Sequence, residues 1–310
     1  MVRGRFAPSP TGRVHLGTAR TALAAWLRAR SQAGAIVMRI EDLDAPRVRP
    51  GSMEAILDDL RWLGIDWDEG PDVGGPHAPY LQSQRLDRYE RSFELLRARG
   101  HLYPCTCSRK EIAEAASAPH GEEPVYPGIC RERPSHPERT PAWRFRMDAP
   151  PGFVDAIAGP SRPGLGEGDF VVRRADGVFA YQLAVVVDDR EMGITEVVRG
   201  DDLLASSPRQ IALHRALGEN DRGPTWMHVP LVVGADGQRL AKRHGAVGID
   251  ELRAAGTSAE TVVAFLASTL GMGGFAGQVS ARELIGRFDP DRVPRAPAVI
   301  DEETLSALRR

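Results

Sequence analysis

Three stretches in the first hundred residues carry apolar side chains at the three- and four-residue spacing of an amphipathic helix. The first follows a short strand at residues 2–6 and is expected to end near Gly34. The second begins at Ser52 as its cap and ends at Gly64, and the third ends at Gly100, because glycine commonly terminates helices. Their inward-facing stripes are Leu16, Ala19, Leu23 and Leu27; Met53, Ile56, Leu57, Leu60 and Leu63; and Leu86, Tyr89, Phe93 and Leu96.

Continuous apolar runs predict strands of a parallel sheet, which are buried on both faces. Residues 35–40 form such a run, and the acidic residues that follow it stand where open α/β sheets bind ligands. Two further strands are expected on either side of Asp176 and Gly177, a dipeptide typical of hairpin turns that would join them. The sequence therefore predicts an α/β fold, whose further strands are expected at residues 170–174, 178–187, 196–200 and 228–233.

The composition is that of a soluble globular protein with a substantial core, since 42% of the 310 residues are hydrophobic and 26% are charged. We expect no signal peptide and no membrane span, because the N-terminus leads into no long apolar run. The net charge of −2 gives no overall attraction to nucleic acid, so an RNA site would be a local patch. Three cysteines make a poor disulfide framework and indicate a reducing cytoplasm, where we expect the chain to act as a monomer.

Residues 5–20 lead from the first strand, through a loop rich in proline and glycine, into the first helix. The N-terminus of a helix suits a phosphate, because its N–H groups are unpaired and its dipole end is positive. Gly12 and Gly17 allow a ligand to lie close to the backbone, and His15 can donate to a phosphate oxygen. The alternative is an ordinary loop with a capping histidine.

The same stretch resembles the first signature of the class I aminoacyl-tRNA synthetases, and Arg-Phe-Ala-Pro-Ser-Pro-Thr-Gly at residues 5–12 narrows the match to the glutamyl branch. Residues 239–243, Arg-Leu-Ala-Lys-Arg, are similar to the second signature, Lys-Met-Ser-Lys-Ser, although Arg239 and Ala241 depart from it. The resemblance implies a Rossmann-type core that uses ATP with Mg²⁺. It assigns ATP binding to His15, Gly17 and Lys242, and catalysis to His15, Lys242 and Arg243.

Two charged side chains and a tyrosine are candidates for holding an amino acid. From spacing, Glu41 fits a ligand-binding strand end or a solvated turn, and Tyr181 fits a strand with its hydroxyl at the surface. Arg199 fits either a bidentate grip on a carboxylate or a surface pair with Asp201 or Asp202. The resemblance implies that Glu41, Tyr181 and Arg199 hold L-glutamate together with Arg5, Phe6, Ala7, Pro8 and Ser9.

Cys105, Cys107 and Cys130 supply three soft ligands for zinc, which takes four in a tetrahedron. Chemistry alone favours His120 as the fourth ligand. The pattern Cys-x-Cys followed by Tyr-x-x-x-Cys instead resembles the glutamyl-queuosine tRNA(Asp) synthetases, in which a tyrosine completes the set, and this implies Tyr126. Such a zinc ion would be structural. The alternative is a set of reduced thiols with the tyrosine as packing.

The resemblance divides the chain into four parts. Residues 1–104 are the first half of the catalytic core, 105–168 a zinc-bearing insertion, 169–247 the second half with the Lys-Met-Ser-Lys-Ser-like loop, and 248–310 a small helical C-terminal region. Capping-box patterns that begin at Thr257 and Ser280 open helices in this last part. It is too short for the anticodon-binding domain of a full glutamyl-tRNA synthetase.

The resemblance implies an enzyme that activates glutamate with ATP to glutamyl-adenylate. Without an anticodon-binding domain, the expected acceptor is the queuosine base in the anticodon of tRNA(Asp). Three other interpretations stay open: a shortened glutamyl-tRNA synthetase that charges the tRNA 3′ end, a non-catalytic RNA-binding relative, and a nucleotidyltransferase of the same superfamily that has no RNA substrate.

Overall fold

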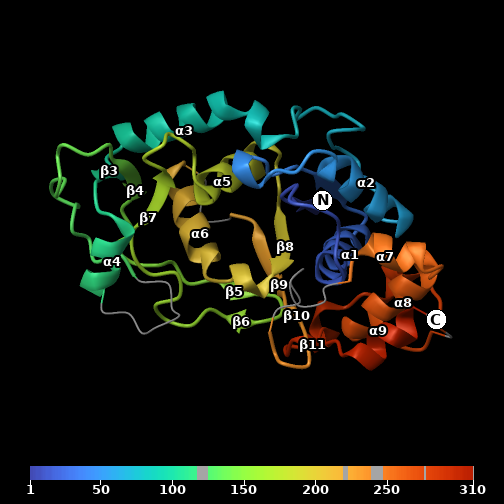
Figure 1. The fold of residues 1–310 in the computed structure, drawn as a ribbon. Coiled ribbons are helices and arrows are strands. Elements are labelled where there is room, and N and C mark those ends of the chain that lie inside the picture. Colours follow the sequence, from blue (N-terminus) through green and yellow to red (C-terminus); the bar gives the residue numbers. More distant parts are fainter. Residues whose placement is uncertain (117–124, 219–222, 239–246, 276, 310) are drawn as a thin grey trace.

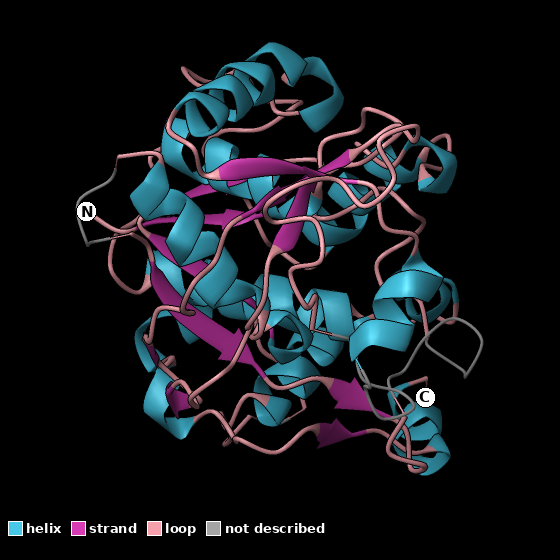
Figure 2. Cartoon of the chain, turned by 90° about the vertical axis from the view of Figure 1, so that its left-hand side faces the viewer, coloured by secondary structure: helices cyan, strands magenta, loops and turns pink. Residues whose placement is uncertain are grey.

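Strands β8 (Glu196–Gly200) and β9 (Thr225–Val229) lie in the middle of an elongated body (Figure 1). Helix α4 (Arg109–Ala116) lies at one end and α9 (Glu302–Leu308) at the other. In the perpendicular view, helices surround the central strands (Figure 2). The computed structural model describes residues 1–116, 125–218, 223–238, 247–275 and 277–309.

The central strands are parallel and end at a common edge. β1 (Arg3–Phe6) pairs with β2 (Ala35–Met38), β8 pairs with β9 in the same sense, and β1 packs beside β8. On the far side, the short β5 (Val154–Asp155) runs parallel to β9, and β6 (Gly159–Pro160) returns antiparallel to β5. The carboxyl ends of β1, β2, β8 and β9 therefore lie together, at the edge where open α/β sheets bind ligands.

The three helices predicted in the first hundred residues are present as α1 (Leu16–Arg30), α2 (Ser52–Trp62) and α3 (Leu86–Ala98). Two details of the prediction are wrong. Ser52 is the first helical residue, and the glycine before it occupies the cap position. Leu86 is 49% exposed, because it begins α3 at a position outside the buried stripe.

The strand expected at residues 178–187 is wrong, because this segment enters helix α5 (Tyr181–Glu191). The hairpin turn at Gly177 does form, but the return strand is reduced to a single bridge at Phe179. Residues 183–187 are all buried within α5, so the run has no polar face of the kind that marks a surface helix. A short apolar run fits a buried helix as well as a buried strand, and here tertiary packing decides.

Two further segments differ from their expected form. The strand expected at residues 228–233 is interrupted at Pro230 and resumes as β10 (Val232–Val233), because proline cannot donate to the ladder. The helix expected at Ser280 has its capping hydrogen bonds, but the chain then forms a 3₁₀ helix at Arg282–Arg287. β10 pairs with β11 (Ala298–Val299) in parallel.

A second, antiparallel sheet carries the segment that holds the cysteines. It consists of β3 (Leu102–Cys105), β4 (Ala142–Phe145) and β7 (Phe170–Arg173). Its apolar face packs against α3 and α5, and α5 in turn packs against α6 (Ser206–Ala216). This packing connects the sheet to the edge where β8 ends.

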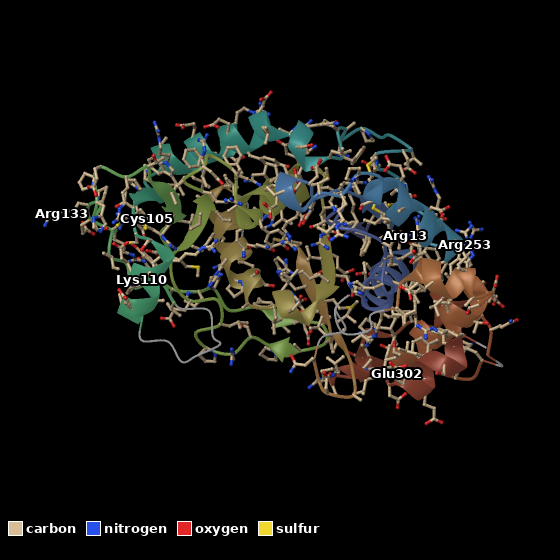
Figure 3. The ribbon with its side chains drawn as sticks, viewed as in Figure 1. Arg13, Cys105, Lys110, Arg133, Arg253 and Glu302 are labelled. Atoms are coloured by element: carbon tan, nitrogen blue, oxygen red, sulfur yellow. The ribbon has the colours of Figure 1, made fainter. Side chains whose placement is uncertain are left out.

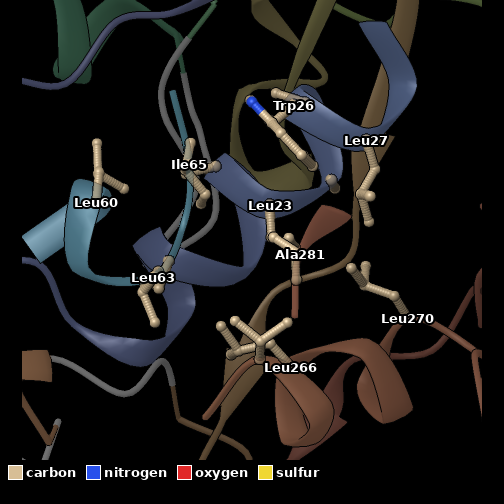
Figure 4. Close-up of a cluster of buried hydrophobic side chains, with 14 of the residues drawn as sticks. Leu23, Trp26, Leu27, Leu60, Leu63, Ile65, Leu266, Leu270 and Ala281 are labelled. Atoms are coloured by element: carbon tan, nitrogen blue, oxygen red, sulfur yellow. The ribbon is translucent and has the colours of Figure 1, made fainter. Parts of the chain in front are cut away.

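The C-terminal helices share one apolar core with the N-terminal half. Figure 4 shows Leu23 and Leu27 of α1 close to Leu266 and Leu270. Among the described residues, no helix combines the length and apolar character needed to cross a membrane. The other α-helices of this region are α7 (Ile249–Ala254) and α8 (Ala259–Thr269). The division of the chain into four parts stays a prediction.

Candidate active site

Arg199, at the end of β8, is 5% exposed and is surrounded by uncharged hydrogen-bond partners. Its Nε donates to Nε2 of His228 at 3.0 Å, and its Nη1 donates to the Tyr181 hydroxyl at 3.2 Å. It also donates to Gln210 Oε1, Ser207 Oγ and the Leu203 carbonyl. Burial lowers the pKa of this guanidinium, and no ion pair with a described carboxylate compensates its charge. A carboxylate ligand would supply that counter-charge.

The orientation of Arg199 depends on a histidine and an aspartate that the sequence did not reveal. Nδ1 of His228 lies 2.6 Å from Oδ2 of Asp155, so the ring donates to this carboxylate and its Nε2 accepts from Arg199. Burial lowers the pKa of His228, which keeps the ring neutral. Asp155 lies in a stretch without periodicity, so no sequence pattern indicated it. His228 was visible only as a polar residue in an apolar strand.

We expect the free energy of unfolding to depend on His228 in a pH-dependent way. The folded pKa of His228 is lowered from 6.5, so its contribution is complete above about pH 6.5 and decreases as the pH falls through the folded pKa. In His228→Gln, the amide oxygen can still accept from Arg199 but does not titrate. Urea unfolding should show the variant to be less stable by about 1–2 kcal/mol at pH 7.5, and this gap should narrow at pH 5. A gap that stays constant with pH would contradict the assignment.

Glu41 follows β2 and joins a buried ion network. Its carboxylate accepts from Nη2 of Arg39 at 3.2 Å, and Arg39 pairs with Asp189 at 2.7 Å. Burial raises the pKa of the Glu41 carboxyl, although Arg39 and Arg5 oppose this. Within the described residues Glu41 forms a single ion pair through one oxygen, so its other oxygen can meet the cationic group of a ligand.

Arg5 lies inside the same network and is 4% exposed. Its Nε lies 3.5 Å from Oδ2 of Asp189, and its Nη1 donates to the Val198 carbonyl at 2.9 Å. These contacts connect β1 to helix α5 and to β8. The structure thus brings Tyr181 and Arg199 into direct contact and places Arg5 and Glu41 in one ion network beside them.

A cavity of about 300 Å³ lies at the N-terminus of α1. His15 caps this helix, because its Nδ1 accepts from the Thr18 N–H at 3.2 Å. A Cβ at position 17 would lie 3.3 Å from the His15 ring, so Gly17 lets the ring lie against the helix. Leu203, whose carbonyl accepts from Arg199, also lines the cavity and connects it to the amino-acid side. The predicted residues in its wall are Phe6, Ala7, Pro8, Ser9, His15 and Gly17.

The basic loop of the predicted site lies outside the described residues. The loop contains Lys242 and Arg243, and also Arg239 and Ala241, which depart from the family signature. His120, the alternative metal ligand, lies in another segment outside the described residues. Their assigned roles stay predictions.

Cys105, Cys107 and Cys130 lie together with the Tyr126 hydroxyl at the end of β3. Their sulfur atoms are within 4.8 Å of one another, and Sγ of Cys107 and Cys130 are 3.5 Å apart. The Tyr126 oxygen lies 3.3 Å from Sγ of Cys105 and 3.6 Å from Sγ of Cys107. Burial raises the pKa of the Cys130 thiol, but hydrogen bonds with Ser135, Thr106 and Cys107 together lower it to about 5. The four side chains can thus surround one metal ion.

Known proteins resemble this chain along its whole length. Residues 1–307 match the family model described as tRNA synthetases class I (E and Q), catalytic domain. The chain is 55% identical to a glutamyl-Q tRNA(Asp) synthetase of Symbiobacterium thermophilum, over 99% of this chain and 98% of that protein. It is 42% identical to a glutamate–tRNA ligase of an Anaeromyxobacter species, over 98% of this chain and 65% of the longer protein. The crystal structure of a glutamate-tRNA synthetase from Elizabethkingia anophelis aligns with a TM-score of 0.84 at 31% identity, over 99% of this chain and 69% of that one.

Proposed function

The chain belongs to the class I tRNA synthetases of the glutamate and glutamine type, and we propose that it activates glutamate with ATP and transfers the glutamyl group to the queuosine base of tRNA(Asp). The relative named for this reaction matches over nearly its full length, whereas the glutamate–tRNA ligase extends well beyond the matched part. The sequence identity is 55% to the first relative and 42% to the second, which favours the modification reaction over charging of the tRNA 3′ end.

The reaction has two steps. In the first, a carboxylate oxygen of glutamate bonds to the α-phosphorus of ATP, and the bond from that phosphorus to pyrophosphate breaks. In the second, a hydroxyl of the acceptor bonds to the glutamyl carbonyl carbon, AMP leaves, and the hydroxyl proton is released. Such steps depend mainly on positioning and on stabilising negative charge.

The observation that carries the proposal is the buried Arg199 guanidinium, which lacks a described carboxylate partner. Glutamate brings two carboxylates and an ammonium. We assign one carboxylate to Arg199 and Tyr181, and the ammonium to Glu41. Arg5 and the loop at residues 6–9 form the adjoining wall.

The cavity at the N-terminus of α1 supports the assignment of ATP, because a helix N-terminus favours phosphate. His15 and Gly17 line this cavity. We assign Lys242 and Arg243 to the phosphates, where positive charge stabilises the charge that develops at the α-phosphorus. Mg²⁺ would accompany ATP and neutralise phosphate oxygens.

The cysteine cluster fits a structural zinc ion. Zinc–sulfur bonds of about 2.3 Å in a tetrahedron place two sulfur atoms roughly 3.8 Å apart. Cys107 and Cys130 come close to this at 3.5 Å, and Tyr126 offers an oxygen as the fourth donor beside Cys105. We infer that these four residues hold one Zn²⁺, which would fasten the insertion to β3.

Labelled glutamate should be transferred to a total tRNA pool that contains queuosine and not to a pool that lacks it. The label should survive removal of the tRNA's 3′ nucleotide, because the bond is at the anticodon base. Glutamate-dependent exchange of pyrophosphate into ATP, measured without tRNA, shows that the enzyme is active in both assays.

Equal labelling of both pools, lost with the 3′ nucleotide, would indicate a shortened glutamyl-tRNA synthetase instead. Absence of pyrophosphate exchange would favour a non-catalytic RNA-binding relative. A cytoplasmic location and a monomeric state stay predictions from the sequence.

A further inference from the structure

A second cavity, of about 570 Å³, lies between α4, the β3–β4–β7 sheet and the first turns of α5 and α6. It is larger than the cavity at α1 and falls in the size range of small-molecule sites. Each cavity is lined by a residue that accepts a hydrogen bond from Arg199, Tyr181 in the larger one and Leu203 in the smaller one. Neither His15 nor Gly17 belongs to the described wall of the larger one.

This second cavity adjoins the amino-acid residues directly. Tyr181, whose hydroxyl accepts from Arg199, contributes to the wall. The neighbouring wall residue Gln182 accepts from Gln210, which in turn accepts from Arg199. A glutamyl group held by Arg199 would therefore lie close to both cavities.

The wall has the chemistry that recognises an unstacked RNA nucleotide. Tyr126, Phe170 and Tyr181 provide aromatic surfaces, and the Arg144 guanidinium lies 3.8 Å from the centre of the Tyr126 ring. Arg209 and Arg109 add positive charge. Single nucleotides in RNA are bound by stacking on aromatic and guanidinium planes and by pairing of phosphate with arginine.

The two carboxylates in the wall, Asp169 and Glu167, do not cancel this positive charge. The Asp169 carboxylate is already paired with Arg131 at 2.6 Å and accepts a hydrogen bond from the Tyr103 hydroxyl. The other carboxylate, Glu167, is exposed to solvent, which screens its charge. Because the whole chain carries a net charge of −2, this basic wall is a local feature that fits an anionic ligand.

We propose that this cavity receives the acceptor nucleotide of the tRNA, with its base against the aromatic wall and its phosphate near Arg109. The proposal rests on the function proposed above and adds where the acceptor binds. The acceptor hydroxyl then adds to the glutamyl carbonyl carbon from this cavity, the hydroxyl proton is released, and AMP leaves toward the cavity at α1. Tyr126 belongs to both the cysteine cluster and the cavity wall, so a metal ion held by the cluster would also shape the acceptor site.

Two adjacent cations on α4 provide a matched test of the phosphate contact. Arg109 lines the cavity, whereas Lys110 is 85% exposed, is absent from the wall, and is seen at the molecular end in Figure 3. Arg109→Glu should lower kcat/KM for queuosine-containing tRNA by about tenfold, the size expected when one phosphate contact is reversed. Lys110→Glu should change it less than about twofold, since long-range repulsion alone is screened by salt. Pyrophosphate exchange without tRNA should be unchanged in both.

A second pair tests the volume of the cavity rather than its charge. Ala113 and Ala115 are both exposed on α4, but only Ala113 belongs to the described wall. Ala113→Trp should block transfer to tRNA while pyrophosphate exchange continues, and Ala115→Trp should leave both reactions intact.

Equal effects within each pair, or loss of pyrophosphate exchange together with transfer, would overturn the assignment of the cavity. Failure of the wild-type enzyme to label queuosine-containing tRNA would instead overturn the proposed function. The two failures are thus distinguishable.

Discussion

Arg199→Ala is expected to raise the KM for glutamate in pyrophosphate exchange by roughly 30-fold or more, because losing one partner of a buried, hydrogen-bonded charge pair costs about 2–5 kcal/mol. The reason lies in how β8 presents this side chain. The guanidinium is buried and oriented by uncharged partners, among them His228, Tyr181 and Gln210, so its positive charge is held in one place for a ligand carboxylate. The KM for ATP should change little, since Arg199 is absent from the described wall of the cavity at α1.

The control is Arg28→Ala, which removes a contact that helix α1 makes with the opposite end of β8. Arg28 pairs with Glu196, the first residue of β8, at 2.9 Å. Its loss should reduce stability without changing the KM for glutamate. Arg199→Lys separates charge from geometry, because lysine keeps the charge but lacks the planar fork. A folded Arg199→Ala enzyme with an unchanged KM for glutamate would show that the carboxylate binds elsewhere.

The residues around this arginine show what the sequence could and could not predict. Arg199 and Tyr181 stand in recognisable motifs, and their contact at 3.2 Å agrees with their joint assignment. The residues that orient Arg199, namely Asp155 and His228, stand far apart in the sequence and outside any motif. They meet because β5 pairs with β9, and no periodicity encodes that pairing.

The secondary structure was likewise predictable only where the sequence carries a visible pattern. Amphipathic helices such as α1 and α3 were predicted correctly, because one polar face makes the helical period visible. The prediction of a strand where α5 forms was wrong, because this apolar run is buried on all sides and shows no helical periodicity. The cysteine spacing predicted the cluster correctly, since Cys105 and Cys107 flank the end of one strand and Tyr126 and Cys130 fold back onto it.

Cys130→Ser is expected to reduce the metal content of the purified protein from about one ion per chain to nearly none, because a structural zinc site needs all four ligands. The insertion should also lose stability. Residues 131–141 lie in no helix or strand. They are linked to the cluster by the hydrogen bond between the Ser135 hydroxyl and the Cys130 sulfur, and the Cys130 N–H donates to the Tyr126 hydroxyl. Limited proteolysis should therefore cut the variant within residues 105–168, whereas the wild type resists.

Ser135→Ala is the matched control, because it removes a hydroxyl 3.3 Å from the Cys130 sulfur but leaves all four ligands in place. It should retain the metal and resist the protease. Since Tyr126 also lines the acceptor cavity, Cys130→Ser should reduce transfer to tRNA more than pyrophosphate exchange, which depends on Arg199 and the cavity at α1. If the wild type contains no metal, or if the variant keeps it, the cluster consists of reduced thiols. In that case the stability of the insertion comes from its sheet and from the ion pair between Arg131 and Asp169.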